Sequence, residues 1–449
     1  MAETKNSLNH DLKDLPDGHD LKKTDKISTP NIQRADKWVF PSDWQVKMLG
    51  TLGSFSKGKG ISTIDLIESG IPCVRYGELY TKHDYVIKNY LSFISESTAS
   101  QSIAITKGDI LFEGSGETIE EIGKSAAIIK DDTVYAGGDI IILTTNLLTD
   151  SICLSYALES DFVRKQKRRL GQGNSVVHIY ARELSKIEIA LPPLPEQRAI
   201  AKVLGKMDEA INANNQLIAQ KELRKKWLMQ NVLTGKQRLK GFSGEWEEVP
   251  LKDDFQRVTR KNGEKNTNVV TISAQRGFVR QQDFFKKNIA SELLDNYFLV
   301  EKGEFCYNKS YSNGYPKGAT KRLNDFDKSV VTTLYICFGI KNKTKTSVDF
   351  FEQFFEANYL DRGLTKIAHE GGRAHGLLNV TPSDFFSLII ATPSFEEQTA
   401  IAQILQAADK ELNLLKAKTD KLKDQKKGMM QVLLTGKKRL KLSEQDLKD

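Results

Sequence analysis

"QNVLTGKQRL" (230–239) and "QVLLTGKKRL" (431–440) are two copies of one decapeptide that lie 201 residues apart and are identical at seven of ten positions. At the same offset, "LPPLPEQRAIAKVL" (191–204) aligns with "TPSFEEQTAIAQIL" (392–405). A chain of 449 residues is longer than one hydrophobic core normally organises. The repeat therefore predicts that the chain consists of two copies of one unit.

The stretches before these segments are also related, at an offset of 195 residues. "KGDILF" (107–112) matches "KGEFCY" (302–307), and "GDIIIL" (138–143) aligns with "TLYICF" (333–338). Short apolar runs of this kind are typical of buried strands. Each copy is therefore predicted to be a strand-rich, mixed α/β domain followed by a long helix.

Both expected helices carry a heptad pattern. From Ile200 and from Ile401 onward, seam residues recur at alternating spacings of four and three. The pattern predicts helices near 196–233 and 397–434, each about 57 Å long, that pack on each other as a coiled coil. Polar Asn214 on the seam is expected to fix the register. The predicted seam comprises Ile200, Leu204, Met207, Ile211, Asn214, Ile218 and Leu228, together with Ile401, Leu405, Leu412, Leu415, Leu422, Met429 and Leu433.

The ends of these helices also have sequence signals. Ser394 with Glu397 fits a capping box at the start of the second helix. Gly235 and Gly436 follow the last seam residues and are suited to stop the two helices. The predicted division of the chain is a polar tail (1–37), a first domain (38–190), a helical segment (191–241), a second domain (242–391), a second helical segment (392–441) and a C-terminal tail (442–449).

The composition indicates a folded protein without a membrane segment. Hydrophobic residues make up 39% of the chain, and no apolar run approaches the roughly 18 residues that span a bilayer. The four cysteines lie far apart without a CxxC pair, which predicts reduced, buried thiols in a cytoplasmic protein. A net charge of +8 favours polyanions such as nucleic acid. His369 and His375 lack further ligands at metal-binding spacing, so no metal site is expected.

The repeated EQ-x-A-I-A…LTGK-x-RL signature, with a divergent domain before each copy, resembles the specificity subunit of type I DNA restriction–modification systems. The resemblance covers roughly residues 38–441. It implies two target-recognition domains in pseudo-twofold tandem repeat, with the two helices packed as an antiparallel coiled coil that spaces them. Each domain would read one half of a split site in double-stranded DNA. The length of the unread gap stays open, because the family's short tandem insertion in the central helix has no evident counterpart here.

The same resemblance implies a chain without catalytic activity. Two methyltransferase subunits would dock mainly on the helices, and two ATP-dependent restriction subunits would join them. S-adenosylmethionine, ATP and Mg are then expected on these partners, and no cofactor or metal on this chain.

Basic and amide-rich loops supply the candidate DNA contacts. "RKQKRR" (164–169) would bind phosphates, and the amides of the following "GQGNS" can pair with adenine. In the second copy, "YNKSYSNGYPKG" (307–318) and "EGGRAHG" (370–376) combine aromatic, amide and cationic side chains. The candidate residues are Lys57, Lys59, Arg164, Lys165, Lys167, Arg168, Arg169, Gln172, Asn174, Lys309, Tyr311, Asn313, Lys317, Arg373 and His375.

Two other functions remain open at this point. "FEGSG" (112–116) matches a glycine loop that binds S-adenosylmethionine in methyltransferases, which would make the chain a stand-alone DNA methyltransferase. Against this, the second copy has "YNKSY" there, and the one Pro-Pro pair lacks the flanking residues of an adenine methyltransferase motif. The second alternative is a coiled-coil adaptor without a DNA role, whose basic clusters are merely solvated.

Overall fold

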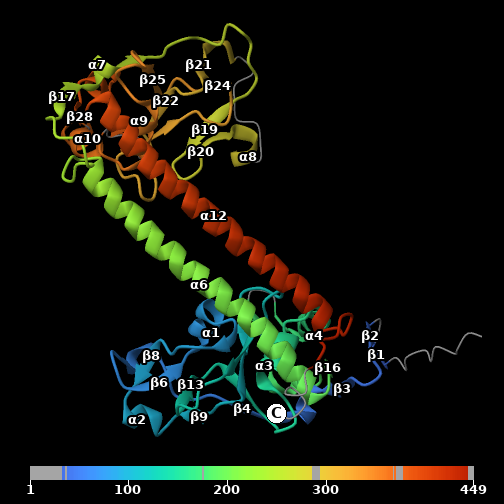
Figure 1. Cartoon of the computed structure of the whole chain (residues 1–449). Helices are drawn as coiled ribbons and strands as arrows, with labels where there is room; N and C mark the ends of the chain where they lie inside the picture. Colours follow the sequence, from blue (N-terminus) through green and yellow to red (C-terminus); the bar gives the residue numbers. More distant parts are fainter. Residues whose placement is uncertain are drawn as a thin grey trace, which may run out of the picture. The chain divides into compact units, whose positions relative to one another are not determined.

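The computed structural model describes residues 33–35, 38–173, 176–285, 294–367, 369–370 and 378–442. It divides into two compact units, of which the first comprises 1–206 and 426–449, and the second comprises 207–425. The helices α6 (Leu194–Val232) and α12 (Phe395–Leu433), green and red in Figure 1, each contribute residues to both units. A unit therefore contains one strand-rich domain together with parts of both long helices.

The domain in the first unit contains two five-stranded sheets. The first sheet has the order β4 (Gly53–Lys57), β14 (Ile140–Thr145), β10 (Asp109–Glu113), β12 (Ser125–Ile128) and β7 (Tyr85–Ile87). The second has the order β5 (Leu66–Ile67), β8 (Ser92–Ile94), β6 (Ile71–Val74), β13 (Val134–Ala136) and β9 (Ile103–Ile105). Three strand pairs complete the unit, namely β3 (Gln45–Met48) with β16 (Glu188–Leu191), β11 (Ser115–Gly116) with β15 (Val177–His178), and β1 (Gln33–Ala35) with β2 (Trp38–Phe40). Its short helices are α1 (Tyr76–Lys82), α2 (Glu96–Ala99), α3 (Ser151–Ala157), α4 (Asp161–Leu170) and α5 (Ala181–Leu184), with 3-10 turns η1 (Leu49–Thr51) and η2 (Thr63–Asp65).

The domain in the second unit is built on a four-stranded sheet. Its order is β18 (Phe255–Arg257), β25 (Ile336–Ile340), β22 (Phe305–Asn308) and β23 (Ala319–Arg322). The remaining strands form pairs: β21 (Phe298–Glu301) with β24 (Lys328–Val331), β19 (Val270–Ser273) with β20 (Gly277–Arg280), β17 (Glu247–Pro250) with β28 (Ile389–Thr392), and β26 (His369–Glu370) with β27 (Leu378–Asn379). The short helices are α7 (Leu251–Asp254), α8 (Gln281–Phe285), α9 (Val348–Glu356), α10 (Asp361–Ile367) and α11 (Pro382–Phe386), with the 3-10 turn η3 (Leu294–Asn296).

The two domains share one topology. The strand order β4-β14-β10-β12 of the first corresponds to β18-β25-β22-β23 of the second. The register agrees as well, since Phe112 pairs with Ser125 and Tyr307, 195 residues after Phe112, pairs with Thr320. The mixed α/β fold and the duplication are therefore confirmed. Residues 33–35 of the expected N-terminal tail form β1, and the rest of 1–37 lies outside the described residues.

Each central strand is buried on both faces, because its alternate side chains enter two different cores. In β10, Phe112 joins a core formed with the helices, whereas Leu111 joins the core between the two sheets. In β22, Tyr307 and Cys306 divide in the same way. Double burial explains why these strands read as continuous apolar runs instead of an alternating pattern.

The long helices complete both cores. Leu204 of α6 and Leu433 of α12 are buried in the core of the first unit, beside Trp44. Leu405 of α12 and Val232 of α6 are buried in the core of the second. Every residue of the predicted seam is buried or half-buried. These side chains are therefore taken up by packing within the protein.

Ion pairs within the second unit give the direction of packing. Lys225 of α6 contacts Asp409 of α12 at 2.5 Å, whereas Glu222 contacts Lys416 at 2.7 Å. Partner numbers on α12 rise as those on α6 fall, so these parts of the two helices are antiparallel, as expected. Asn214 on the seam is buried.

The repeated signature forms two crossed contacts between the copies. Arg238 of the first "LTGKxRL" binds Glu397 of the second "EEQ", with Nε–Oε1 and Nη2–Oε2 distances of 2.7 and 2.5 Å. Arg439 of the second copy binds Glu196 of the first, with both distances at 2.6 Å. Both carboxylates are buried, and both contacts are bidentate, the strongest geometry for this pair. Each copy of the motif therefore closes the unit that contains the other copy's helix start.

The adjacent glutamines repeat a second contact. The Gln197 side chain accepts from the backbone N–H of Asp150 at 2.9 Å and donates to the Pro192 carbonyl at 2.8 Å. The Gln398 side chain accepts from the N–H of Ser347 at 2.7 Å and donates to Pro393 at 2.9 Å. Asp150 and Ser347 are the N-caps of α3 and α9. The glutamines thus fix the start of the equivalent helix in each domain.

The helix ends follow the sequence signals with one exception. Gly235 and Gly436 both have φ of +68°, a conformation that favours glycine after a helix. Ser394 accepts from the N–H of Glu397, at 3.4 Å, as in a capping box. Among the described residues, the return hydrogen bond from the Ser394 N–H to the Glu397 carboxylate does not form, because Arg238 binds both carboxylate oxygens.

Replacing Arg439 by methionine is expected to lower the free energy of unfolding of the first unit by about 3 kcal/mol, because Glu196 would stay buried without its counter-charge. Denaturant unfolding of the full chain measures the loss. Lys437→Met changes an exposed side chain of the same segment and serves as the control. Equal stability of Arg439→Met and Lys437→Met would contradict a structural role for the crossed contact.

Candidate nucleic-acid interface

In the first domain, two loops that are far apart in sequence lie together. The loop after β10 forms β11, which pairs with β15 at the end of the predicted "GQGNS" segment. Ser115 Oγ lies 2.9 Å from His178 Nδ1, and the Ile179 N–H donates to the Gly114 carbonyl at 2.9 Å. Gln172 and His178 exchange backbone hydrogen bonds of 2.9 and 2.7 Å. The described residues on the two sides of the predicted amide loop are therefore paired with each other and held against the loop after β10.

Gln172, which pairs with His178, is exposed, and Asn174 lies outside the described residues. The glycines of "FEGSG" fall in this paired segment, since Ser115–Gly116 is β11. Lys57 and Lys59 are exposed at and after the end of β4, and the Lys57 ammonium lies 3.9 Å from Asp139. Among the described residues, neither lysine makes a hydrogen bond or ion pair with Gln172 or His178.

The basic cluster lies on α4, which presents cations on its outer side. Arg164, Lys165, Arg168 and Arg169 are exposed. The Arg164 Nε lies 3.0 Å from the Glu159 carboxylate. These four side chains remain candidates for phosphate contacts.

Lys167 departs from the expectation for this cluster. Its side chain is 2% exposed, and its ammonium lies 2.9 Å from Glu159 and donates to the Gly123 carbonyl at 2.6 Å. A lysine held in this way is part of the domain's interior and has no access to phosphate. The sequence contained the signal, because Lys167 follows the buried Val163 by four residues and so lies on the same helix face.

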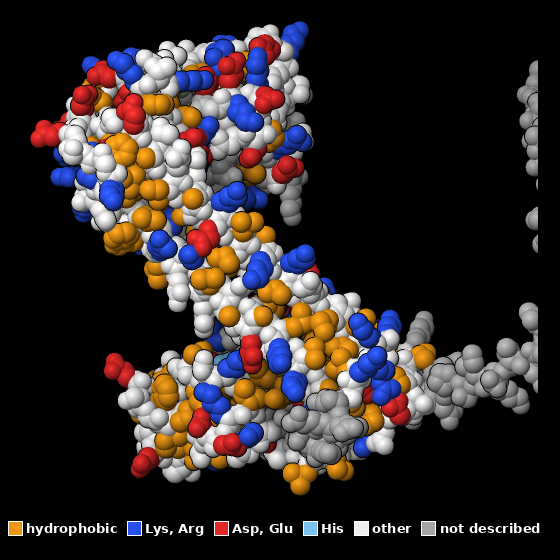
Figure 2. All heavy atoms as spheres, in the orientation of Figure 1, with side chains coloured by type: hydrophobic (Ala, Val, Ile, Leu, Met, Phe, Trp, Pro, Cys, Tyr) orange, Lys and Arg blue, Asp and Glu red, His pale blue; other side chains and the backbone are white. Residues whose placement is uncertain are grey.

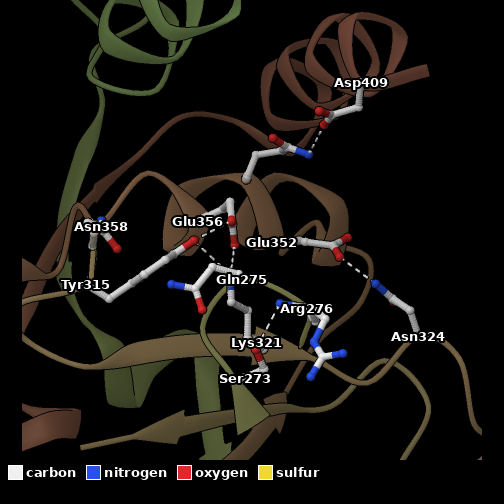
Figure 3. A network of polar contacts seen from close by, with 12 residues as sticks. Ser273, Gln275, Arg276, Tyr315, Lys321, Asn324, Glu352, Glu356, Asn358 and Asp409 are labelled. Atoms are coloured by element: carbon white, nitrogen blue, oxygen red, sulfur yellow. Dashed lines mark hydrogen bonds and ion pairs between the residues drawn. The ribbon is translucent and has the colours of Figure 1, made fainter. Parts of the chain in front are cut away.

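In the second domain, the 307–318 segment connects β22 to β23 and is held from inside by two of its tyrosines. Tyr307 stacks on Phe385 with ring centroids 4.9 Å apart, and its hydroxyl donates to the Lys317 carbonyl at 2.7 Å. The Tyr315 hydroxyl donates to Glu356 at 2.6 Å (Figure 3). Burial raises the pKa of both phenols well above the usual range, so both stay protonated donors.

The remaining polar groups of this loop point away from the core. Tyr311 is 67% exposed, and Asn313 is exposed while its carbonyl accepts from the Gln275 side chain at 3.0 Å. Lys309 and Lys317 are half-buried. The Lys309 carbonyl accepts from the Leu378 N–H at 3.1 Å, so this loop adjoins the predicted "EGGRAHG" segment. Arg373 and His375 of that segment lie outside the described residues.

A buried carboxyl lies beneath the loop of the first domain. Glu113, at the end of β10, is fully buried, and neither carboxylate oxygen has a hydrogen-bond partner. Burial raises its pKa to about 8, with Lys124 opposing and Glu159 reinforcing the shift. The equivalent residue of the second domain is the neutral Asn308, whose side chain makes hydrogen bonds with Ser310 and Ile272. A protonated Glu113 is likewise neutral.

The described residues offer little for other chemistry. They contain no group of three or more His, Cys, Asp or Glu side chains able to hold a metal ion. Every described helix is too short or too polar to cross a bilayer. All four cysteines are buried free thiols, as predicted.

The surface of the long helices is mixed in character. Figure 2 shows Lys and Arg side chains interspersed with hydrophobic ones along them. The exposed apolar side chains are Leu217, Leu223 and Trp227 on α6 and Ile404 and Leu414 on α12.

Comparisons with known proteins agree with this arrangement. Residues 41–222 match the family described as "Type I restriction modification DNA specificity domain". The type I restriction enzyme MjaVIII specificity subunit of Methanocaldococcus jannaschii is 24% identical over 440 residues, which cover 89% of this chain and 94% of the relative. The putative type I restriction enzyme MjaX specificity subunit of the same organism is 27% identical over 438 residues, covering 92% and 97%. The chain is therefore similar to these type I specificity subunits over most of its length.

Solved structures share the fold. The type I restriction–modification S subunit from M. genitalium has a TM-score of 0.54 at 16% identity, and the match covers 90% of this chain and 98% of that one. A chain from a structure described as the "structural basis underlying complex assembly" of the type I system has a TM-score of 0.52 at 14% identity, covering 88% and 98%.

Sequence reasoning missed the residues that shape the loops. The partners of Glu196 and Glu397 could have been suspected, because both glutamates and both arginines recur at the same offset. Glu159 binds Lys167, and Glu356 binds Tyr315. Neither glutamate had a sequence signal beyond its charge.

The raised pKa of Glu113 predicts a pH effect on the stability of the protein. Between about pH 4.5 and 8 the folded state keeps a proton that the unfolded state has lost, so the free energy of unfolding falls by up to about 1.4 kcal/mol per pH unit. Glu113→Gln should lack this component and be the more stable protein above pH 8. Unfolding curves from pH 5 to 9 measure it, with the exposed Glu120→Gln as control. Parallel pH profiles of wild type and Glu113→Gln would contradict the assignment.

Proposed function

We propose that this chain is the non-catalytic specificity subunit of a type I restriction–modification system and reads a bipartite target in double-stranded DNA, with one domain on each half-site. The observation that carries the proposal is the combination of one duplicated scaffold with two unlike loop sets. Both domains have the same sheet order and the same helix-start contacts. In the equivalent loops, between β10 and β12 and between β22 and β23, one domain has Ser115 bonded to His178 and the other has the exposed Tyr311 and Asn313. Such divergence is expected where only the sequence that is read differs.

We further propose that the outer surfaces of α6 and α12 dock two methyltransferase subunits, which two ATP-dependent restriction subunits then join. Exposed apolar side chains such as Trp227 and Leu414 support a protein-binding role for these surfaces. The chain would present one adenine of each half-site to a docked methyltransferase. S-adenosylmethionine, ATP and Mg would be bound by the partners.

Mapping methylated adenines in the host genome with and without this gene tests the function. One bipartite motif should lose its methylation when the gene is removed. Replacing residues 38–190 by those of a relative should change one half of the motif and leave the other half and the spacing intact. A change of both halves, or of neither, would contradict the assignment of one domain to each half-site.

Lys165 and Lys167 lie close together on α4, but we expect Lys165 to bind DNA phosphates and Lys167 to stabilise the fold. Lys165→Met should lower DNA affinity of the assembled complex on all sequences and reduce the slope of log K against log salt by about 1. Lys167→Met should mainly lower the free energy of unfolding, because Glu159 and the Gly123 carbonyl lose their partner. Titrations at several salt concentrations and denaturant unfolding separate the effects. An unchanged salt slope for Lys165→Met would remove α4 from the interface.

A further inference from the structure

The helices α3 and α9 occupy the same place in the two domains. Their N-cap residues, Asp150 and Ser347, are bound by the duplicated glutamines of the long helices. Nine residues after each N-cap the chain has a glutamate, Glu159 in the first domain and Glu356 in the second. These two carboxylates are therefore structurally equivalent, although the sequences around them have diverged.

In the second domain, Glu356 holds the loop between β22 and β23. Its carboxylate accepts from the Tyr315 hydroxyl at 2.6 Å and pairs with the ammonium of Lys321. Lys321 also donates to the Tyr315 hydroxyl at 3.0 Å and lies 4.5 Å from the centre of its ring. Figure 3 shows the three side chains converging between the loop, β23 and α9. Tyr315 of the loop and Lys321 of β23 are thereby tied to α9.

In the first domain, Glu159 holds the equivalent loop through a different group. Its carboxylate pairs with Lys167 at 2.9 Å, and the same ammonium donates to the Gly123 carbonyl at 2.6 Å. Gly123 ends the loop between β10 and β12, as Gly318 ends the loop between β22 and β23. Both glycines have positive φ, of 70° and 83°. One carboxylate position thus anchors both loops, whereas the bridging cation comes from α4 in one domain and from β23 in the other.

The short helices beside these anchors are themselves fixed to the long helices, since Glu356 ends α9 and Glu159 lies just after the end of α3. The Gln353 side chain of α9 donates to Asp409 of α12 at 3.0 Å, and Asp409 pairs with Lys225 of α6 (Figure 3 shows Asp409). At the position equivalent to Gln353, Tyr156 of α3 lies 4.9 Å from the ammonium of Lys426 of α12. Lys225 and Lys426 are themselves 201 residues apart. Each loop is therefore connected to the long helices through one short helix.

We propose that Glu356 and Glu159 are positioning residues for sequence reading. Glu356 fixes the β22–β23 loop, which contains the candidate DNA contacts Tyr311 and Asn313, and Glu159 fixes the β10–β12 loop, against which the segment with Gln172 is held. The inference rests on the proposed function and adds the residues that set its selectivity. Base discrimination requires side chains held within about half an ångström of their productive positions. The Glu356 side chain is 40% exposed, so its loss should disturb the loop more than the stability of the domain.

The test uses the specificity subunit assembled with its methyltransferase subunits. Glu356→Gln should lower discrimination against single-base changes by about tenfold in one half-site and leave the other half-site unchanged. Glu159→Gln should affect the opposite half-site. The matched control is Glu352→Gln, on the same helix. Glu352 binds Arg322 and Asn324 and, among the described residues, makes no hydrogen bond or ion pair with the β22–β23 loop. Competition binding with a set of singly substituted duplexes measures all three.

Tyr315→Phe provides a second variant that keeps the ring and removes only the hydroxyl bonded to Glu356. It should relax the same half-site as Glu356→Gln. Equal loss of affinity on every sequence, or unchanged discrimination in both variants, would overturn the positioning role. If the wild-type complex itself showed no preference for a bipartite site, the proposed function would fail and not this inference alone.

Discussion

The bidentate contacts between Glu196 and Arg439 and between Glu397 and Arg238 are the constraint on which the rest of this structure depends. Each pairs the start of one repeat's helix with the end of the other repeat's helix. A buried carboxylate has a large desolvation cost unless a partner reaches it, so neither unit can close without a segment of the other copy. Two repeats that could have folded as separate globules are therefore mutually dependent.

This dependence explains where the sequence is duplicated and where it diverges. Glutamates, glutamines, arginines and glycines of the signature recur because both copies make the same contacts with each other's segments and with the starts of α3 and α9. The loops after β10 and β22 take no part in these contacts, and their side chains differ in chemistry. A common scaffold that carries unlike loops is suited to reading two unlike half-sites.

The loops are more constrained than their composition indicates. Of the three tyrosines in 307–318, Tyr307 and Tyr315 face inward and only Tyr311 is largely exposed. Of the cations in 164–169, Lys167 faces inward. Aromatic and basic residues that look like DNA contacts therefore include the residues that hold the loop, and the two kinds are distinguished by burial.

Local spacing in the sequence determined the duplication, the long helices, their heptad seam and the glycines that end them, because each is a periodic or short-range property of the chain. The resemblance to type I specificity subunits followed from the same repeated motif. Tertiary structure alone decided which cation each carboxylate binds, since Glu196 and Arg439 are 243 residues apart and many other arginines and lysines were available. It also decided that Glu159 and Glu356 occupy equivalent positions and hold equivalent loops. Contacts between remote segments are set by packing, and no periodic sequence pattern predicts them.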